Sequence, residues 1–435
     1  MSLAVVILAA GKGLRLNSKK FKVMHEVGNS PMLYHLINTA NQLRPSKIII
    51  VISFQMQNIQ SEIKKKFPYV IFCIQKEQLG TADAVNSAKD LINKKISKVL
   101  VLYGDTPLIK IKTLKKLINN LSKKNTDMCI LTMKPKDLKH YGRVIVDKNK
   151  RVEKIIEFSE ATKQEKKNDL CNSGIMVFKS LELIKYIKFI SNNNSKKEFF
   201  LTDIVEVFQK NQKIIGHELC EDDETIGVND RDDLLNIEMI FQKQKIQEFS
   251  SKGVTLLDSR TIYFSYDTKI GKDSIIYPNV YFGKEVDIGK NVKVKSFSHI
   301  EGAVIKNNCE VGPFARIRPE SVINDYARVG NFVEIKKSNI KKNVKIPHLS
   351  YIGDSLIDLG TNIGAGTITC NYDGIKKSET KIGKNCFIGS NSSLIAPLSI
   401  GDNSIIGAGS VIKKNVSKSV IIYGKSKIVK RNKKN

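Results

Sequence analysis

The sequence lacks the residue clusters that mark disulfide-stapled and zinc-bound proteins. It has seven cysteines, an odd number, with no Cys-x-x-Cys pair, and its six histidines form no cluster beside them. Such a scattered, odd set is typical of reduced thiols in a cytosol. We therefore expect a cytoplasmic protein with neither a disulfide framework nor a zinc site.

The chain also lacks a hydrophobic run long enough to cross a membrane. Its apolar start, Met1 to Ala10, is much shorter than the roughly 20 residues that a spanning helix needs. No basic segment precedes this stretch, which leads directly into Gly11 and so does not fit a signal peptide. The stretch is predicted to be a buried first strand, and no integral membrane association is expected.

Acidic residues are scarce relative to basic ones. The chain has 72 Lys and Arg against 43 Asp and Glu, a formal net charge of +29. Such a charge alone would suggest a polyanionic partner. The excess is nearly all lysine, however, and it is spread along the chain beside abundant Ile and Asn; only Lys425 to Lys434 forms a dense basic run. This pattern indicates a compositional bias, so no specific nucleic-acid partner is expected.

In the second half of the chain, aliphatic residues recur every six positions. The last such run is Ile382, Ile388, Leu394, Ile400, Ile406 and Ile412. A spacing of six drifts around a helix but keeps side chains on one face of an extended chain. The pattern predicts a parallel β-helix whose aliphatic side chains stack inward, coil upon coil. A long break at Asn371–Gly374 predicts a loop that reaches out of it.

The first half alternates between aliphatic runs and helical patterns. Strands are predicted at Leu3–Ala9, Lys47–Ile52, Tyr69–Ile74 and Lys98–Tyr103, with helices at Met32–Leu43 and Thr81–Leu91 between them. Buried parallel strands with crossover helices form an open α/β sheet, whose ligands lie beyond the carboxyl ends of the strands. A connecting helix is predicted from Asp230 to Ser251. We therefore expect an α/β domain over 1–230, a linker helix over 231–252 and the β-helix domain over 253–435.

A glycine-rich segment, Leu8-Ala9-Ala10-Gly11-Lys12-Gly13-Leu14-Arg15, follows the first predicted strand. Consecutive backbone N–H groups there can cradle a phosphate, with charge added by the guanidinium of Arg15 and the ammonium of Lys22. The segment matches neither the dinucleotide-binding fingerprint nor the P-loop. A plain tight turn remains the alternative.

Further motifs along the chain, together with this segment, resemble those of a known family. They are Gln78-Leu79-Gly80-Thr81, Tyr103-Gly104-Asp105, Tyr141-Gly142-Arg143, Glu157, Asn172-Ser173-Gly174 and Gly227-Val228-Asn229. In this order they resemble sugar-nucleotide pyrophosphorylases, and a hexapeptide-repeat half resembles acyltransferases. Nearly the whole chain is similar to the bacterial family that joins N-acetylglucosamine-1-phosphate uridylyltransferase to glucosamine-1-phosphate N-acetyltransferase.

The resemblance implies a Rossmann-like open sheet followed by a left-handed β-helix. It also implies a bifunctional enzyme of UDP-N-acetylglucosamine synthesis, which serves the formation of bacterial wall precursors. Such an enzyme acetylates glucosamine 1-phosphate with acetyl-CoA and then transfers UMP from UTP to N-acetylglucosamine 1-phosphate, releasing pyrophosphate. A homotrimer with acetyltransferase sites between subunits is implied as well, since closed cyclic symmetry covers the flat faces of a β-helix.

The resemblance also assigns residues to the nucleotidyl-transfer site. Mg²⁺ suits this chemistry, because it is held by few protein ligands together with phosphates. Asp105 and Asn229 are implied as its ligands, although each could instead be a helix cap. Arg15 and Lys22 are implied to be catalytic. The residues implied to bind UTP or the sugar are Leu8, Gly11, Gly13, Gln75, Gly80, Thr81, Tyr103, Gly104, Gly142, Glu157, Asn172 and Asn229. Among them, Gln75, Gly80 and Thr81 would hold uracil, and Gly142, Glu157 and Asn172 would hold the sugar.

The acetyl-transfer site is assigned in the same way. Acetyl transfer to an amine benefits from a general base, and His348 is implied in that role, although a lone histidine is more often structural. Arg318 and Lys336 would bind the sugar phosphate, Tyr351 and Asn362 the sugar, and Glu334 would lie beside the amine. The residues implied to bind acetyl-CoA are Ala365, Asn371, Tyr372, Ser390, Ala408 and Lys425.

Four positions depart from the family pattern. Leu14 stands where Thr is usual, Phe21 where Pro is usual, Glu320 where Gly is frequent, and Lys425 where an Arg would contact CoA. Lys425 keeps the charge but loses the bidentate fork of arginine. Two other hypotheses remain: a pyrophosphorylase whose β-helix only oligomerises or senses products, and a degenerate scaffold or polyanion-binding protein.

Overall fold

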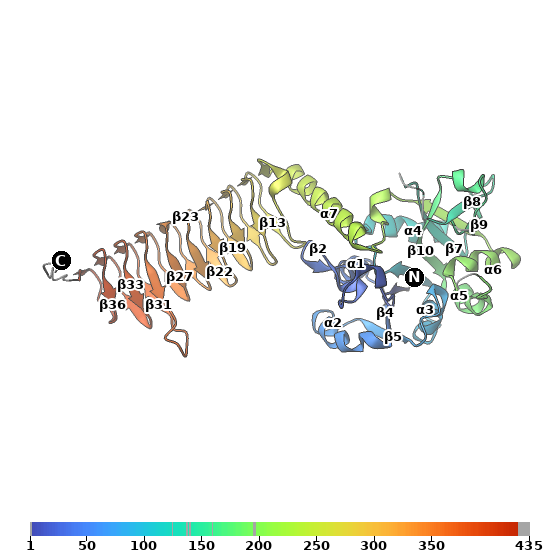
Figure 1. Cartoon of the computed structure of the whole chain (residues 1–435), viewed down its shortest axis with the longest axis horizontal. Helices are drawn as coiled ribbons and strands as arrows, with labels where there is room; N and C mark the ends of the chain where they lie inside the picture. The colour runs from blue at the N-terminus through green and yellow to red at the C-terminus, as the bar shows by residue number, and fades with distance from the viewer. Residues whose placement is uncertain are drawn as a thin grey trace, which may run out of the picture. The chain divides into compact units, whose positions relative to one another are not determined.

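The structure is a computed structural model that describes residues 2–424, apart from 124, 136, 137, 139, 140, 159, 195 and 196. It divides into two compact units, Met1–Phe241 and Gln242–Asn435. The first runs from blue to yellow-green and the second from there to red in Figure 1. Lys425, one of the predicted acetyl-CoA residues, lies outside the described residues. Within the described ranges, no helix is both long and apolar enough to cross a membrane.

The first unit is built on a nine-stranded sheet whose main path runs β11-β7-β10-β6-β1-β4-β5, with β8 and β9 beside it. Its strands are β1 (Leu3–Leu8), β4 (Lys47–Ser53), β5 (Ile71–Gln75), β6 (Lys98–Tyr103), β7 (Met128–Met133), β8 (Arg143–Val146), β9 (Val152–Ile156), β10 (Cys171–Lys179) and β11 (Ile215–Leu219). The four predicted strands are β1, β4, β5 and β6, and their mutual pairings are parallel, as predicted. The sheet as a whole is mixed, because β10 runs antiparallel to β6 and β7.

The helices of the chain cover this sheet or connect the units. They are α1 (Met32–Asn41), α2 (Gln60–Lys66), α3 (Thr81–Ser87), α4 (Ile111–Lys123), α5 (Ser180–Tyr186), α6 (Ile204–Lys210) and α7 (Arg231–Ser251). The two faces of the sheet form separate cores. Ala4 and Val6 of β1 face one core, and Val5 and Ile7 face the other. Burial on both faces is why the first strand is aliphatic throughout.

The helix α7 spans the division between the two units. Within the first unit, Glu238 accepts a hydrogen bond from the backbone N–H of Gly28 at 2.8 Å. Within the second, Gln242 exchanges two hydrogen bonds with the backbone of Phe264. The helix predicted over Asp230–Ser251 is therefore present. The helix predicted over Thr81–Leu91 is shorter, because α3 ends at Ser87 and a 3-10 turn, Lys89–Leu91, follows it.

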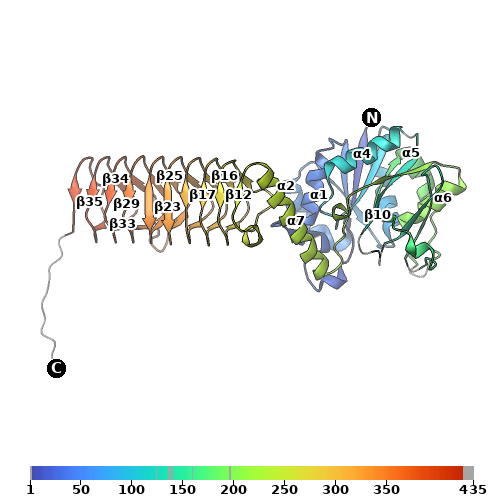
Figure 2. The ribbon, with the colours of Figure 1, turned by 90° about the horizontal axis from the view of Figure 1, so that it is seen from above.

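The second unit is a parallel β-helix of three sheets, here called sheets I, II and III in the order in which the chain visits them in each coil (Figures 1 and 2). Sheet I contains β12 (Thr255–Leu256), β14 (Ile275–Ile276), β17 (Lys293–Val294), β20 (Glu310–Val311), β23 (Arg328–Asn331), β26 (Lys345–His348), β29 (Asn362–Ile363), β32 (Phe387–Ile388), β35 (Ile405–Ile406) and β37 (Ile421–Ile422). Sheet II contains β15 (Tyr281–Phe282), β18 (His299–Ile300), β21 (Arg316–Ile317), β24 (Glu334–Lys336), β27 (Tyr351–Gly353), β30 (Ile368–Cys370), β33 (Ser393–Ile395) and β36 (Val411–Ile412). Sheet III contains β13 (Lys269–Ile270), β16 (Asp287–Ile288), β19 (Ala303–Ile305), β22 (Ser321–Ile323), β25 (Asn339–Ile340), β28 (Ser355–Ile357), β31 (Thr380–Ile382) and β34 (Leu398–Ile400).

The six-residue recurrence marks the interior of this β-helix. Ile382, Leu394 and Ile406 are 1%, 0% and 0% exposed and belong to one continuous core. Neighbouring coils pair in parallel register, as in Ile363 with Ile388 and Ile388 with Ile406. The prediction of a β-helix is thus confirmed, while its left-handed sense stays a prediction from the resemblance.

The predicted loop is present between β30 and β31. Residues 371–379 leave the coil and project from it, as Figure 1 shows beside β31. Ile375 is 92% exposed and Tyr372 is 58% exposed. Two hydrogen bonds from the backbone N–H groups of Ile375 and Lys376 to the carboxylate of Asp373 hold the tip of the loop in a turn.

Candidate active sites

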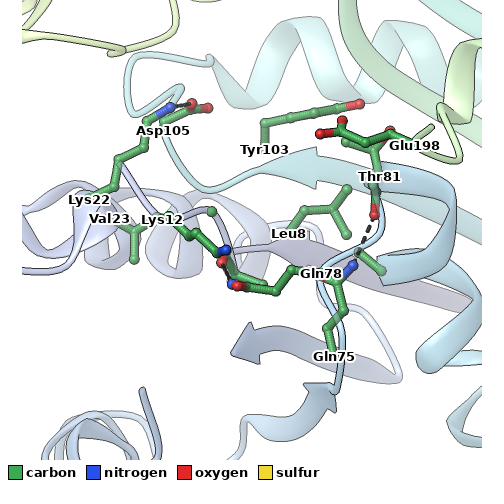
Figure 3. Close-up of a pocket in the computed structure, with 14 residues that line it drawn as sticks. Leu8, Lys12, Lys22, Val23, Gln75, Gln78, Thr81, Tyr103, Asp105 and Glu198 are labelled. Atoms are coloured by element: carbon green, nitrogen blue, oxygen red, sulfur yellow. Dashed lines mark hydrogen bonds and ion pairs between the residues drawn. The ribbon is translucent and has the colours of Figure 1, made fainter. Parts of the chain in front are cut away.

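A pocket of about 380 Å³ opens at the carboxyl ends of β1, β5 and β6 (Figure 3). It is lined by Leu8, Ala10, Gly11, Lys12, Lys22, Val23, Gln75, Gln78, Gly80, Thr81, Ala84, Tyr103, Asp105 and Glu198. Leu8, Gln75 and Tyr103 are the last residues of their strands. The position agrees with the rule that open α/β sheets bind ligands beyond their carboxyl ends.

The glycine-rich segment is held against Lys22. Gly13 has a φ of +63°, and a Cβ atom there would lie 2.7 Å from Cβ of Lys22. Both the backbone conformation and the close approach require glycine. Phe21 stands where proline was expected, and its φ of −59° lies in the range that proline would impose. The departure at Phe21 therefore leaves the backbone before Lys22 in the same conformation.

Lys22 lies between the two predicted metal ligands. Its Nζ forms an ion pair with Oδ2 of Asp105 and donates a hydrogen bond to Oδ1 of Asn229 at 3.3 Å. Figure 3 shows the ion pair with Asp105. Two side-chain oxygens from distant parts of the chain therefore lie beside one ammonium group, an arrangement that would also suit a divalent cation.

The alternative roles of these two residues as helix caps do not fit. The next α-helix after Asp105, α4, begins only at Ile111. At the start of α7, the cap is Asp230, whose Oδ1 accepts a hydrogen bond from the backbone N–H of Asp233 at 3.0 Å. The described residues contain no group of three or more His, Cys, Asp or Glu that could hold a metal. A metal at Asp105 and Asn229 would thus take its remaining ligands from phosphates and water, as Mg²⁺ commonly does.

The predicted uracil-binding residues lie together at the other end of the pocket. Gln75 is 3% exposed, and its Nε2 donates to the carbonyl of Gly80 at 3.0 Å and to Oδ2 of Asp83 at 2.7 Å. Gly80 has a φ of +120°, and a Cβ atom there would meet the carbonyl oxygen of Phe199 at 2.5 Å. Thr81 accepts a hydrogen bond from the backbone N–H of Leu201 at 2.9 Å. These bonds fix the amide of Gln75 in one orientation.

The three predicted sugar-binding residues are also neighbours. The backbone N–H of Asn172 donates to the carbonyl of Gly142 at 2.8 Å. A Cβ atom on Gly142 would lie 3.7 Å from Oε1 of Glu157, which accepts a hydrogen bond from the hydroxyl of Thr202 at 3.3 Å. Burial, with the charge of Glu157 second, raises the pKa of the neighbouring Asp203 carboxyl to about 6. The cluster therefore combines a carboxylate, an amide and backbone groups, which suit hydroxyl and acetamide groups.

Two other predicted residues have different surroundings. Arg15 lies in the 3-10 turn Leu14–Leu16, is exposed, and is not among the described residues that line the pocket. Gly104 packs tightly, since a Cβ atom there would meet Val23 at 2.7 Å and the carbonyl oxygen of Leu8 at 2.8 Å. Gly104 thus brings the end of β6 close to β1. The catalytic role of Arg15 and the role of Gly104 in binding UTP or the sugar remain proposals.

In the second unit, predicted residues form a row along the corner between sheets I and II. Asn331 pairs with His348, and Lys345 pairs with Asn362, which places Ala365 one coil beyond His348. The same backbone hydrogen bond recurs along this corner. The N–H of Leu349 donates to the carbonyl of Asn331, that of Asn391 to the carbonyl of Ala365, and that of Gly409 to the carbonyl of Ser390. The residues in this row are Asn331, His348, Ala365, Ser390 and Ala408. Four of them are predicted site residues, and the small ones leave space beside His348.

The predicted phosphate-binding residues occupy the opposite edge of sheet II. The pairing of Arg316 with Glu334 places Arg318 beside Lys336 on successive coils. Nη1 of Arg318 forms an ion pair with Oε1 of Glu334 at 2.7 Å, and Nζ of Lys336 lies 3.8 Å from Oδ2 of Asp354. The ammonium of Lys336, close by, lowers the pKa of Lys377 in the projecting loop. Cations crowded in this way favour an anionic ligand.

The predicted sugar and acetyl-CoA residues lie on different faces of the β-helix. Tyr351 lies on sheet II, in register with Ile368, whereas Asn362 lies on sheet I, in register with the half-exposed Phe387. Asn371, after sheet II, donates a hydrogen bond to Asp354, away from the row of Ala365. One β-helix alone therefore does not gather the whole predicted set around one point.

Comparisons with known proteins cover both units. A nucleotidyl transferase family model matches residues 4–220, and the bacterial transferase hexapeptide model matches residues 267–302, 302–337 and 379–414. The chain is 42% identical to the Bifunctional protein GlmU of Zymomonas mobilis, covering 97% of this chain and 94% of that protein. It is 43% identical to the Bifunctional protein GlmU of Wolbachia pipientis wMel, covering 98% of both.

The chain belongs to the bifunctional GlmU family. A more distant relative, from a Geobacillus species, still shares 37% identity over 98% of this chain. The resemblance recognised in the sequence is thus confirmed. A GlmU-family chain of this kind is a transferase with a nucleotidyltransferase half and a hexapeptide-repeat half.

Some residues of these sites are not predicted by the sequence motifs. Glu198 lines the pocket from a segment that carries no recognisable motif. Asp83 orients the amide of Gln75. The only sequence feature that could have indicated this role is its position in the first turn of α3, three residues after Gly80. Glu320, where the family often has glycine, has a φ of +62°, which explains why glycine is frequent there.

Proposed function

We propose that this chain is the bifunctional enzyme that makes UDP-N-acetylglucosamine from glucosamine 1-phosphate, acetyl-CoA and UTP. The observation that carries this proposal is the match to bifunctional GlmU proteins over nearly the whole chain, through both halves. We assign uridylyl transfer to a domain over 1–230, acetyl transfer to a domain over 253–435, and a linking role to 231–252. Scattered cysteines without a Cys-x-x-Cys pair suit a place in the reducing cytoplasm.

Acetylation comes first in the proposed order. The amine of glucosamine 1-phosphate attacks the thioester carbonyl of acetyl-CoA, a C–N bond forms, and the C–S bond breaks. The amine proton passes to Nε2 of His348, and CoA leaves as a thiolate that is then protonated. Arg318 and Lys336 hold the phosphate, and Ala365, Ser390 and Ala408 contact acetyl-CoA beside His348. Asn371 and Tyr372, which lie away from this row, are assigned to acetyl-CoA as well, and Lys425 is assigned to it from the sequence alone.

Uridylyl transfer follows in the pocket of the first unit. A phosphate oxygen of N-acetylglucosamine 1-phosphate attacks the α-phosphorus of UTP, and the bond to pyrophosphate breaks. Mg²⁺ bound by Asp105 and Asn229 would neutralise charge on the phosphates. Lys22 and Arg15 add positive charge. The carbonyl of Gln75 accepts the N3–H of uracil, because the amide nitrogen of Gln75 already donates to Gly80 and Asp83. Glu157 and Asn172 hold the sugar.

A homotrimer is proposed because one β-helix does not bring Tyr351 and Asn362 to one face. A second observation supports assembly at the corner of His348. Phe297, Phe314 and Phe332 stack along this corner with centroid distances of 4.9 and 5.0 Å. They are 54%, 45% and 54% exposed, and each has a positive φ, a conformation that bulky residues rarely adopt. At equivalent turns elsewhere the residue is often asparagine, such as Asn291 or Asn343.

Substitution of the central residue of these three stacked phenylalanines should separate the two activities. We expect Phe314→Glu to convert the trimer to monomers and to lower acetyl transfer by about 10-fold or more, because a buried unpaired charge opposes association. Uridylyl transfer should stay at the wild-type rate. Light scattering at micromolar concentration and the two assays provide the readouts, with Phe314→Leu as the apolar control. A Phe314→Glu monomer with full acetyl transfer would exclude shared sites.

The substrate assignment is tested by identifying the product. Incubation with glucosamine 1-phosphate, acetyl-CoA, UTP and Mg²⁺ should give UDP-N-acetylglucosamine by mass spectrometry. If glucosamine 1-phosphate gave no product while N-acetylglucosamine 1-phosphate did, the β-helix would have only an assembly or sensing role. RNA retained on nitrocellulose at high as well as low salt would instead support a polyanion-binding scaffold.

A further inference from the structure

We infer that Asn331 is a positioning residue for the acetyl-transfer reaction: it holds the imidazole of His348 in the tautomer whose Nε2 accepts the proton of the substrate amine. The inference rests on the proposed function, in which His348 is the general base. Neither residue lines the nucleotide pocket, and both belong to the second unit.

The contact between the two side chains is direct. Nδ1 of His348 and Oδ1 of Asn331 are 2.5 Å apart. The two residues are in register on the adjacent strands β23 and β26, and the backbone N–H of Leu349 donates to the carbonyl of Asn331 at 3.0 Å. The backbone thus places the amide beside the imidazole before any substrate binds.

Gly330 makes this placement tight. A Cβ atom on Gly330 would lie 1.7 Å from the carbonyl oxygen of Pro347, the residue before His348. Any side chain at position 330 would push the two coils apart and lengthen the contact between Asn331 and His348. The same corner is closed further along by glycines in equivalent places, such as Gly364 against Ser390 and Gly389 against Ala408. The pair therefore sits in a rigid part of the coil.

The direction of the hydrogen bond sets the chemistry. A neutral imidazole carries one proton, and a carbonyl oxygen can only accept, so Nδ1 must donate to Oδ1 of Asn331. The lone pair then lies on Nε2, on the far side of the ring from Asn331. The other tautomer would present an N–H to the substrate amine and could not take its proton.

The neutrality of asparagine matters as much as its geometry. A carboxylate in the same place would stabilise the imidazolium and raise its pKa. The charged groups on the flanking strands are Arg328 on β23 and Lys345 on β26, which are in register with each other. Both are cations, and neither changes when position 331 is substituted. A shift in the pKa of the His348 imidazole relative to wild type therefore reports on position 331 alone.

Two substitutions of Asn331 test the inference in the full-length protein. Asn331→Leu keeps the approximate shape but removes the acceptor, and we expect kcat for acetyl transfer to fall by about 5- to 20-fold, the worth of one well-placed hydrogen bond. The KM values for glucosamine 1-phosphate and acetyl-CoA should change little. Asn331→Asp keeps the acceptor and adds charge, so its kcat should recover at high pH. The acid limb of the pH–rate profile of Asn331→Asp should move to higher pH, because a raised imidazole pKa leaves less free base at low pH.

Controls distinguish failure of this inference from failure of the proposed function. In a His348→Ala background, Asn331→Leu should cause no further loss. Wild-type acetyl transfer by His348→Ala would overturn both the base assignment and the inference. A large loss in His348→Ala with wild-type kcat in Asn331→Leu would overturn the inference alone. Equal losses in the Leu and Asp variants, without a shift of the acid limb, would show a structural role and also overturn it.

Discussion

Asp105→Ala is expected to lower pyrophosphate release from UTP and N-acetylglucosamine 1-phosphate by at least about 10²- to 10³-fold, the usual loss when a group that stabilises transition-state charge is removed. The carboxylate of Asp105 faces the same cation as the amide oxygen of Asn229. Without it, a metal would keep only one protein ligand and Lys22 would lose its ion-pair partner. The Mg²⁺ concentration needed for half-maximal rate should therefore rise as well.

Acetyl transfer by Asp105→Ala should equal that of wild type, because the assigned acetyl-transfer residues lie in the second unit. Glu221→Ala is a matched control: it also removes a carboxylate from a lysine pair, with Lys110, but its side chain is 76% exposed. Such exposed pairs contribute little, so the control should keep both activities. Normal pyrophosphate release by Asp105→Ala would show that the metal ligand has been assigned wrongly.

His348→Ala is expected to lower acetyl transfer by ~10²- to 10⁴-fold at pH 7, the range typical of a lost general base. A sugar amine is mostly protonated at neutral pH, and its ammonium form cannot attack a thioester. The loss should shrink as the pH rises, since more of the amine is then free without help. Acetyl-CoA binding should change modestly, because the small residues Ala365, Ser390 and Ala408 remain.

Uridylyl transfer from supplied N-acetylglucosamine 1-phosphate should be unchanged in His348→Ala. His299→Ala offers a matched control within the same β-helix, since His299 is a half-exposed histidine whose ring packs against Tyr281. It should retain acetyl transfer. Loss of both activities in His348→Ala would point to a structural role for His348, and full acetyl transfer at pH 7 would remove it from the mechanism.

The β-helix could be predicted from the sequence because its repeat is short and its interior is uniform. Each coil buries side chains such as Ile388 and Ile406 in the same way, so local spacing carries the fold. The α/β half was predicted less completely. The aliphatic runs identified the parallel strands, but an aliphatic run does not reveal strand direction, and the antiparallel β10 was missed.

The candidate sites, too, were predicted only in part from the sequence. Motifs placed Asp105 and His348, but contacts between distant residues came only from the structure. Lys22 meets Asn229 across 207 positions, which no local pattern encodes. The pairing of Asn331 with His348 spans 17 positions, one coil, yet the breaks between the six-residue runs hide the coil length at this point. Glu198 lies in the pocket without any motif at all.

The central claim is that one chain carries two independent transferase sites. It is tested most directly by one reaction containing glucosamine 1-phosphate, acetyl-CoA, UTP and Mg²⁺, in which free CoA thiol and pyrophosphate are followed separately. Wild type should release CoA first and pyrophosphate after a lag. Asp105→Ala should release CoA alone, and His348→Ala should release almost neither until N-acetylglucosamine 1-phosphate is added, which should restore pyrophosphate at the wild-type rate. Pyrophosphate release from glucosamine 1-phosphate without CoA release, or parallel loss of both signals in Asp105→Ala, would contradict the claim.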